Sequence, residues 1–214
     1  MKTIDFYFDF ISPYAYLAFE RLPVALQGLS YEVRYQPVLF AGLLQQHGQL
    51  GPAEIAPKRG WTWRHVSWLA RELDIPLRLP PRHPFHPLGL LRLAWACARQ
   101  GAPNRFVVET LFHQVWQSGQ PADDPQVLQA LVEQLQPALA PDDPTVKQQL
   151  REATEAALAA GVFGVPSLVV DGRLFWGLDG LPLLRAHIEG GEAGAALDAL
   201  WSAPDGVGAG VQRQ

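Results

Sequence analysis

The stretch DFISPYAYLA, residues 9–18, places a serine and a proline where an alternating apolar segment gives way to helical spacing. Ser12 suits the N-cap of that helix, because its hydroxyl can accept a hydrogen bond from a free backbone N–H, worth about 1 kcal/mol. Pro13 suits the first helical position, which needs no N–H. A hydroxyl at the positive end of a helix can also donate a hydrogen bond to a thiolate, whose pKa that environment lowers. The motif is therefore open to two interpretations, a helix cap and a thiol-activating site.

Thiol chemistry at Ser12 would need a sulfur from another molecule. Cys97 is the single cysteine of the chain, so a disulfide within the chain is excluded. It lies among apolar neighbours in the helical pattern LRLAWACARQG, which is typical of a cysteine that packs as a small buried hydrophobic residue.

The residues that flank the junction predict the element that positions it. Residues 3–10 alternate with a period of two and predict a strand, with Ile4, Phe6, Phe8 and Phe10 on one face and Asp5, Tyr7 and Asp9 on the other. Helical spacing runs from Pro13 to about Gly28, and residues 30–38 have the composition of a second strand. This β-α-β order has a crossover of the right length for a parallel pair.

The rest of the chain predicts helices and then a hairpin. Residues 40–57 favour a loop or a short irregular helix, and the proline-rich segment 79–87 a connection. Asp171-Gly172 inside 167–176 predicts a hairpin with a type I′ turn. Helical patterns cover 59–74, 88–101, 104–118, 125–135, 143–160 and 181–190.

Assembled, these elements predict an α/β chain with a thioredoxin-like fold and a large all-helical insertion. The thioredoxin-like domain would be discontinuous and would comprise residues 1–40 and 158–200, with the insertion at 41–157. Residues 202–214 are rich in Gly, Ala and Pro, and we expect a disordered tail there.

In this fold the positions Ser12 to Ala15 correspond to the Cys-x-x-Cys of thioredoxin-like proteins, with both sulfurs replaced. Pro166 directly precedes a predicted strand, where such folds carry a cis-proline that faces the helix N-terminus. The backbone of Val165 could then pair with an extended peptide by strand addition. A peptide that carries a thiol would bring its sulfur to Ser12, and glutathione is the obvious candidate.

The bulk composition restricts partners and location. The chain has 214 residues, of which 48% are hydrophobic and 18% charged, so it should fold around a packed core. A formal net charge of −4 and the lack of a basic stripe argue against a nucleic-acid partner. The sequence has neither an apolar run of membrane-spanning length nor the apolar segment of a signal peptide. We therefore expect a cytoplasmic protein with no membrane partner.

Four segments carry a resemblance to a known family: DFYFDFISPYAYLA, APKRGWTWRHVSWLARELDIPL, FHPLGLLRLAWA and GVFGVPSLVVDGRLFWGLDGLPLL. In this order, and up to about residue 190, the chain resembles the 2-hydroxychromene-2-carboxylate isomerases, which are relatives of the kappa-class glutathione transferases and of DsbA-type proteins. The resemblance implies a glutathione-dependent cis-trans isomerase for a small aromatic carboxylate, acting by thiolate addition, bond rotation and elimination. It also implies a homodimer, since relatives are often dimers.

The resemblance assigns roles to five residues. Ser12 matches a serine that hydrogen-bonds the glutathione sulfur, and Lys58 matches a lysine near the glutathione and substrate carboxylates. Val165 and Pro166 match the segment that pairs with the glutathione backbone, and Asp179 matches an acidic residue that holds the γ-glutamyl end. From the residues alone, Lys58 also fits a solvated surface charge, and Asp179 fits the N-cap of the last helix.

The chain departs from the family pattern at several positions. Leu178 stands where the family has Asn or Ser, Gly180 where it has Arg, Gln49 where it has Asn, His65 where it has Asp and His86 where many relatives have Asn. Departures near the glutathione contacts keep alternatives open: a kappa-like transferase, a non-catalytic thioredoxin-like binding module and, most remotely, a redox oxidoreductase.

Two further groups of residues bear on ligand binding. His83 and His86 are interrupted by prolines and have no matching Cys/His pair nearby, so we expect no metal site there. Four aromatic residues fit the core as well as a cleft, and in a cleft they would favour a flat aromatic substrate; they are Tyr14, Phe40, Trp61 and Trp68.

Overall fold

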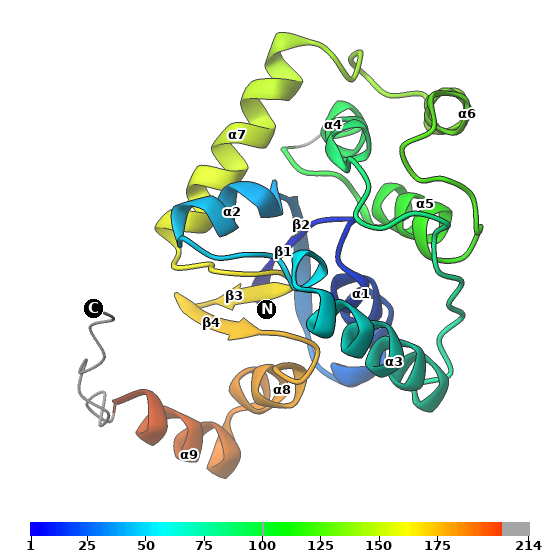
Figure 1. Cartoon of the computed structure of the whole chain (residues 1–214). Coiled ribbons are helices and arrows are strands. Elements are labelled where there is room, and N and C mark those ends of the chain that lie inside the picture. The colour runs from blue at the N-terminus through cyan, green and yellow to red at the C-terminus, as the bar shows by residue number, and fades with distance from the viewer. Residues whose placement is uncertain (100, 203–214) are drawn as a thin grey trace.

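The computed structural model describes residues 1–99 and 101–202 and contains a four-stranded sheet with the order β2-β1-β3-β4 (Figure 1). Its strands are β1 (Lys2–Phe8), β2 (Tyr31–Pro37), β3 (Ser167–Val170) and β4 (Arg173–Trp176). β1 pairs in parallel with β2, while the β1/β3 and β3/β4 pairs are antiparallel. The predicted thioredoxin-like arrangement with a parallel β-α-β unit and a late hairpin is confirmed.

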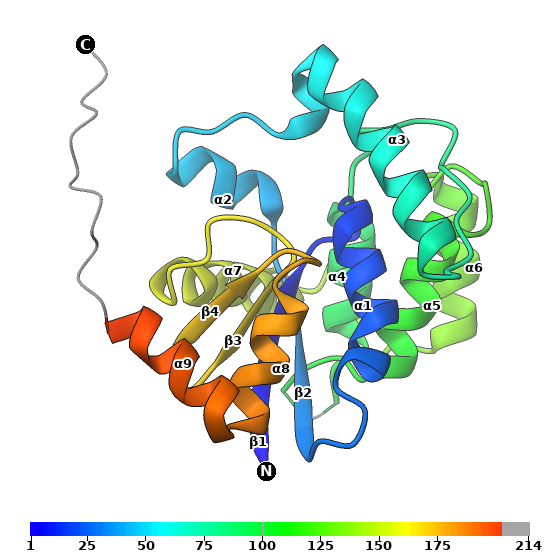
Figure 2. The same ribbon diagram turned by 90° about the horizontal axis from the view of Figure 1, so that it is seen from below.

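Helices cover both faces of this sheet. The crossover helix α1 (Pro13–Ala25) and the late helix α8 (Leu181–Glu189) pack together on one face, and α7 (Pro144–Ala159) contacts β2 from the other (Figure 2). The predicted N-caps Ser12 and Asp143 are confirmed, since each side chain accepts a hydrogen bond from a backbone N–H in the first turn of its helix.

The central strand β1 corrects the prediction of one apolar and one polar face. Tyr7 is 7% exposed, and Asp9, which follows the end of the strand, is fully buried. A strand in the middle of a sheet with helices on both faces is buried on both sides, so its polar positions need not face water. Asp9 therefore belongs to the interior.

The hairpin turn follows the predicted chemistry. Asp171 and Gly172 have φ values of 51° and 75°, the two positive angles that a type I′ turn requires.

The helical insertion lies between β2 and β3. It begins with the short helix α2 (Phe40–Gln46), as the 40–57 pattern allowed, and a single 3-10 turn, η1 (Pro52–Glu54). The predicted helix 59–74 is confirmed as α3 (Ala56–Glu72), with a start three residues earlier. The remaining helices are α4 (Leu88–Ala96), α5 (Arg105–Trp116), α6 (Pro125–Leu135) and, before β3, α7. None of the helices among the described residues is long and apolar enough to cross a membrane.

Two helix boundaries differ from the prediction. The helix predicted over 88–101 ends at Ala96, because the Ala96 carbonyl accepts the backbone N–H groups of Ala138 and Leu139 and is not free to continue the helix. A further helix that the sequence analysis missed, α9 (Gly191–Ser202), packs on α8. The predicted disordered tail, 202–214, otherwise lies outside the described residues.

An aromatic cluster fills the interface between β1, α1 and α5. Phe112 of α5 contacts four rings with centroid separations of 4.9–6.0 Å; they are Phe8, Phe10, Tyr16 and Phe19. All five side chains are fully buried. This cluster lies beneath the junction between β1 and α1 and fixes the start of α1.

Candidate active site

Ser12 lies at the junction of β1 and α1 with 7% of its surface exposed. Its Oγ accepts the Ala15 backbone N–H at 3.2 Å, so the predicted N-cap is present. The same hydroxyl donates to the Val165 carbonyl oxygen, 3.4 Å away and 153 residues distant in sequence. A donor at that separation is weakly engaged and can turn to a stronger acceptor.

The Val165–Pro166 segment faces Ser12 across the site. Its peptide bond is cis, the arrangement that the thioredoxin-like interpretation expects at this position. Val165 is 8% exposed, and the Pro166 carbonyl accepts the Gly177 backbone N–H at 2.9 Å. The two motifs that the sequence predicted, at Ser12 and at Val165, are 153 residues apart and are brought together by the sheet.

A cavity of about 1740 Å³ opens in front of this junction. One wall, which we call the sheet-side wall, consists of the junction and the cis-proline segment; the other, the α3 wall, consists of η1, α3 and the 82–88 connection. Aromatic rings line much of it, namely Tyr14, Phe40, Trp61, Trp63, Phe85, Phe163 and Trp176, and basic side chains are set among them, namely Arg21, Lys58, Arg59, Arg82 and Arg185. This composition suits an apolar, flat ligand that carries negative charge.

All five predicted site residues border this cavity. Lys58 is exposed in the first turn of α3, and Asp179 is exposed just before α8. The N-cap of α8 is Gly180, and no side chain caps it, so the interpretation of Asp179 as a helix cap is wrong. Which ligand each of the five residues contacts remains a prediction.

Four of the five departures from the family pattern also border the cavity, and Gly180 does not. Gln49 and Leu178 line it. At Gly180 a Cβ atom would come within 2.6 Å of the Trp176 carbonyl oxygen, so the local backbone admits only glycine. An arginine cannot replace it without a shift of the chain, and any γ-glutamyl contact here must be made without that side chain.

Asp9 is a buried carboxyl group that the sequence analysis did not select. Its two oxygens accept the backbone N–H groups of Ile11, at 3.1 Å, and Phe40, at 3.0 Å. Burial raises the pKa of this carboxyl to about 7, although the two hydrogen bonds act in the opposite direction. Asp9 ties the junction that carries Ser12 to the start of α2. The signal in the sequence was an acid enclosed by Phe8 and Phe10 immediately after a strand.

The two histidines of the proline-rich connection have separate roles. His83 forms a 2.8 Å hydrogen bond between its Nε2 and the Ile11 carbonyl oxygen. Since a carbonyl only accepts, the Nε2 atom carries the proton, and burial lowers the pKa of the ring. His86 is exposed, and its backbone N–H donates to Asp123. His83 therefore braces the residue before Ser12.

A third histidine pairs with the junction helix. The Tyr14 hydroxyl and the His65 Nδ1 are 2.9 Å apart, and both residues border the cavity. The His65 ring is stacked between Trp61 and Trp68 of its own helix, with interplanar angles of 20° and 11°. The sequence predicted this helix but not the bond to Tyr14.

Cys97 is buried, as predicted, and does not border the cavity. Burial raises the pKa of its thiol to about 11, so the thiol is protonated near neutral pH. Any thiolate that acts at Ser12 must come from a bound molecule.

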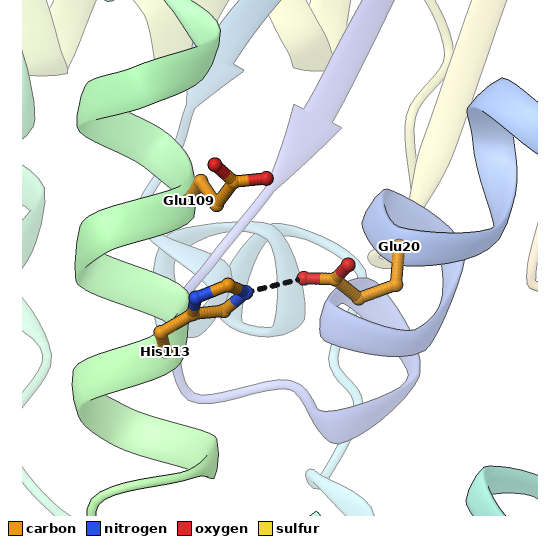
Figure 3. Close-up of side chains that lie close together, drawn as sticks. All are labelled: Glu20, Glu109 and His113. Carbon is orange, nitrogen blue, oxygen red and sulfur yellow. Dashed lines mark hydrogen bonds and ion pairs between the residues drawn. The ribbon is translucent and has the colours of Figure 1, made fainter. Parts of the chain in front are cut away.

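A cluster of metal-ligating residue types lies elsewhere, between α1 and α5 (Figure 3). The donor atoms of Glu20, Glu109 and His113 lie within 4.8 Å of one another. His113 is bonded to Glu20 at 2.8 Å, and Arg105 to Glu109 at 3.3 Å. Because each of the three residues already has a partner, we interpret the cluster as a structural network in which the bond between His113 and Glu20 joins the two helices.

The serine at a helix N-terminus, the facing cis-proline and the sheet order define a thioredoxin-like protein without a redox dithiol. Comparisons with known proteins agree: the family model of the DSBA-like thioredoxin domain matches residues 3–189. A 2-hydroxychromene-2-carboxylate isomerase from Sphingobium xenophagum is 30% identical over 198 residues, which cover 87% of this chain and 98% of the relative.

Two further comparisons point the same way. Glutathione S-transferase kappa 1 from Caenorhabditis elegans is 36% identical over 84 residues, 38% of this chain and 36% of the relative. The solved structure of a 2-hydroxychromene-2-carboxylate isomerase superposes with a TM-score of 0.76 at 24% identity, over 94% of this chain and 100% of the other. The chain belongs to the DSBA-like thioredoxin family, within its group of isomerases similar to 2-hydroxychromene-2-carboxylate isomerase.

Proposed function

We propose that this enzyme is a glutathione-dependent cis-trans isomerase that acts on a small aromatic carboxylate similar to a ring-opened 2-hydroxychromene-2-carboxylate. The observation that carries the proposal is Ser12, which caps α1 in front of Val165 and borders an aromatic cavity with basic side chains. The isomerase relatives support the reaction class, and the kappa-class transferase supports glutathione.

The residues present fit glutathione. The Ser12 hydroxyl donates only a 3.4 Å bond to Val165, and it lies at the positive end of a thirteen-residue helix, where an anion is stabilised. Val165 and Pro166 would pair with the peptide backbone, and Asp179 would face the ammonium of the γ-glutamyl end. Lys58 would face a carboxylate.

Glutathione would supply the thiolate that adds to the conjugated double bond and leaves after the bond has rotated. The chain's own contribution is to hold and orient. Ser12 and the N-terminal N–H groups of α1 keep the bound thiol ionised near neutral pH. Lys58 and Arg59 hold the substrate carboxylate, while the aromatic wall excludes water from the reacting bond.

A kappa-like glutathione transferase is the second candidate, because it shares the thiolate step and differs only in whether glutathione leaves. The partial match to the kappa-class relative favours it. Product analysis with a model electrophile separates the two: an isomerase returns free glutathione, and a transferase yields a stable conjugate. A non-catalytic binding module would give neither.

The test is calorimetric titration of glutathione into the wild-type protein and into Ser12→Ala, with the ultraviolet absorbance of the thiolate recorded alongside. We expect the wild type to bind glutathione as the thiolate and Ser12→Ala to lose the thiolate signal. Turnover should fall about 10²–10³-fold, as when one donor to a developing anion is removed.

Ser30→Ala is the matched control, since Ser30 is exposed and does not border the cavity. It should behave as the wild type. Absence of glutathione binding to the wild type, or full activity without any thiol, would refute the proposal.

A further inference from the structure

We propose that Tyr14 and His65 form a site for the anionic oxygen of an aromatic ligand, a phenolate or an enolate, inside the cavity. The inference goes beyond glutathione binding and deepens the proposed function by naming which group of the substrate is recognised. It depends on the proposed function only for the identity of the natural ligand.

The geometry of the pair carries the argument. The Tyr14 Oη and the His65 Nδ1 are 2.9 Å apart, close enough for a full hydrogen bond, and both side chains are half-buried at the cavity. Tyr14 lies in the first turn of α1, two residues after Ser12, and His65 lies on α3 across the opening. The pair therefore bridges the wall that holds Ser12 and the opposite wall.

The bond can run in either direction, and the direction decides what the cavity presents. When Tyr14 donates to an unprotonated Nδ1, its oxygen offers the cavity an acceptor. When the Nδ1 of His65 carries a proton and donates to the Tyr14 oxygen, the phenol hydrogen is released toward the cavity. In that second state the Tyr14 hydroxyl donates to an oxyanion, and the hydrogen bond that it accepts from His65 strengthens it as a donor.

Two features hold the pair ready for this role. Trp61 and Trp68 stack on the two sides of the His65 ring, at centroid separations of 5.9 and 6.3 Å, and so fix the plane of the imidazole. Burial raises the pKa of Tyr14, a hydrogen bond with Thr62 acts in the opposite direction, and the negative charge of Asp179 raises the pKa further, so Tyr14 is a protonated donor near neutral pH.

The stack of Trp61, His65 and Trp68 is not part of the core, and Trp61 and His65 border the cavity. Trp61 and Trp68 are 64% and 56% exposed, and α3 buries only Val66 and Ala70 among its seventeen residues. A helix that needed these indoles for stability would bury them. Lys58 and Arg59 on the same helix add positive charge at the cavity, which favours an anionic ligand.

The probe for this site is 4-hydroxy-3-nitrobenzoate, an aromatic carboxylate whose visible absorbance distinguishes its phenol from its phenolate. Binding is measured at a pH near the pKa of the free probe and without glutathione. We expect the wild type to bind the phenolate about tenfold more tightly than the phenol, as a hydrogen bond to a charged group predicts. The apparent pKa of the bound probe therefore falls by about one unit.

Tyr14→Phe should remove most of this preference while retaining binding of the methoxy analogue, whose ring oxygen cannot ionise. His65→Leu should reduce it partly, because Tyr14 then donates without support. Tyr31→Phe is the matched control, since Tyr31 lies on β2 and does not border this cavity, and it should leave the preference unchanged.

Equal affinity of the wild type for phenol and phenolate, or an unaltered preference in Tyr14→Phe, would overturn the inference. The measurement contains no glutathione, so its failure is distinguishable from failure of the proposed function. If glutathione does not bind but the phenolate preference depends on Tyr14, the proposed function is refuted and the oxyanion site remains.

Discussion

The two walls of the cavity are built by different means. On the sheet-side wall, Ser12 and Val165 are 7% and 8% exposed, and Asp9 beneath them is fully buried. On the α3 wall, Trp61 is 64% exposed, and the helix that carries it buries two side chains. The first wall is an extension of the core, while α3, the helix of the second wall, buries few of its side chains.

The difference separates residues that are held in place by the fold from residues that are available to contact a ligand. Residues of the sheet-side wall are positioned by backbone hydrogen bonds and core packing, so changes there alter folding and the placement of Ser12 together. The exposed side chains of α3 contribute little to stability, so changes at those positions act on ligands. Substitutions on the two walls should therefore differ in whether they change stability or ligand binding.

The largest effect is expected from Phe112→Ala, in the core beneath the sheet-side wall. Phe112 is fully buried against rings of β1 and α1, and its removal leaves a cavity. The free energy of unfolding, measured with urea, should fall by about 3–5 kcal/mol. Phe106→Ala removes a ring of the same helix that is 60% exposed, and it should change the same quantity by less than about 0.5 kcal/mol. Equal losses in the two variants would contradict the comparison.

Asp9→Asn tests the sheet-side wall through pH. Burial raises the pKa of Asp9 to about 7, above its unfolded value, so between roughly pH 4 and 7 the folded state binds more protons than the unfolded state. The stability that the protonated carboxyl contributes is complete below that range and is lost as the pH rises through it. The free energy of unfolding of the wild type should fall relative to Asp9→Asn by up to roughly 4 kcal/mol.

The measurement is a series of urea unfolding curves for both proteins from pH 4 to 8. Every other titrating group is shared, so the difference between the curves isolates Asp9. If the free energies of unfolding of the two proteins change with pH in parallel, Asp9 is ionised in the folded state at little cost. The interpretation of the sheet-side wall as part of the core would then be wrong.

The sequence predicted the sheet-side wall better than the α3 wall, for a physical reason. The turn and cap signals at Ser12, Pro13 and Asp171-Gly172 act locally, so they could be recognised without knowledge of the fold. The position of Pro166 opposite Ser12 followed once the β-α-β and hairpin units were assembled. The caps and the turn depend on a few neighbouring residues, and the position of Pro166 depends on the order of strands in the sheet.

What could not be predicted depends on contacts between distant segments. Asp9 was assigned to a polar face because alternation alone cannot show that a strand will be covered on both sides. The end of α4 at Ala96 was missed because a segment more than forty residues later captures its carbonyl. The bond between Tyr14 and His65 joins two helices, and the hydrophobic periodicity of the sequence does not show how these helices are placed relative to each other.

The smallest effect on stability, and the most selective one on function, is expected from Trp61→Ala. Trp61 borders the cavity and is largely exposed, so the free energy of unfolding should change by less than about 0.5 kcal/mol. Loss of one aromatic contact should weaken binding of an aromatic carboxylate about 3–10-fold, measured by calorimetry. Trp68→Ala removes a similarly exposed indole of the same helix that does not border the cavity, and its effect on affinity should be smaller. If Trp61→Ala instead unfolds the protein, the α3 wall is part of the core, and the contrast between the two walls does not hold.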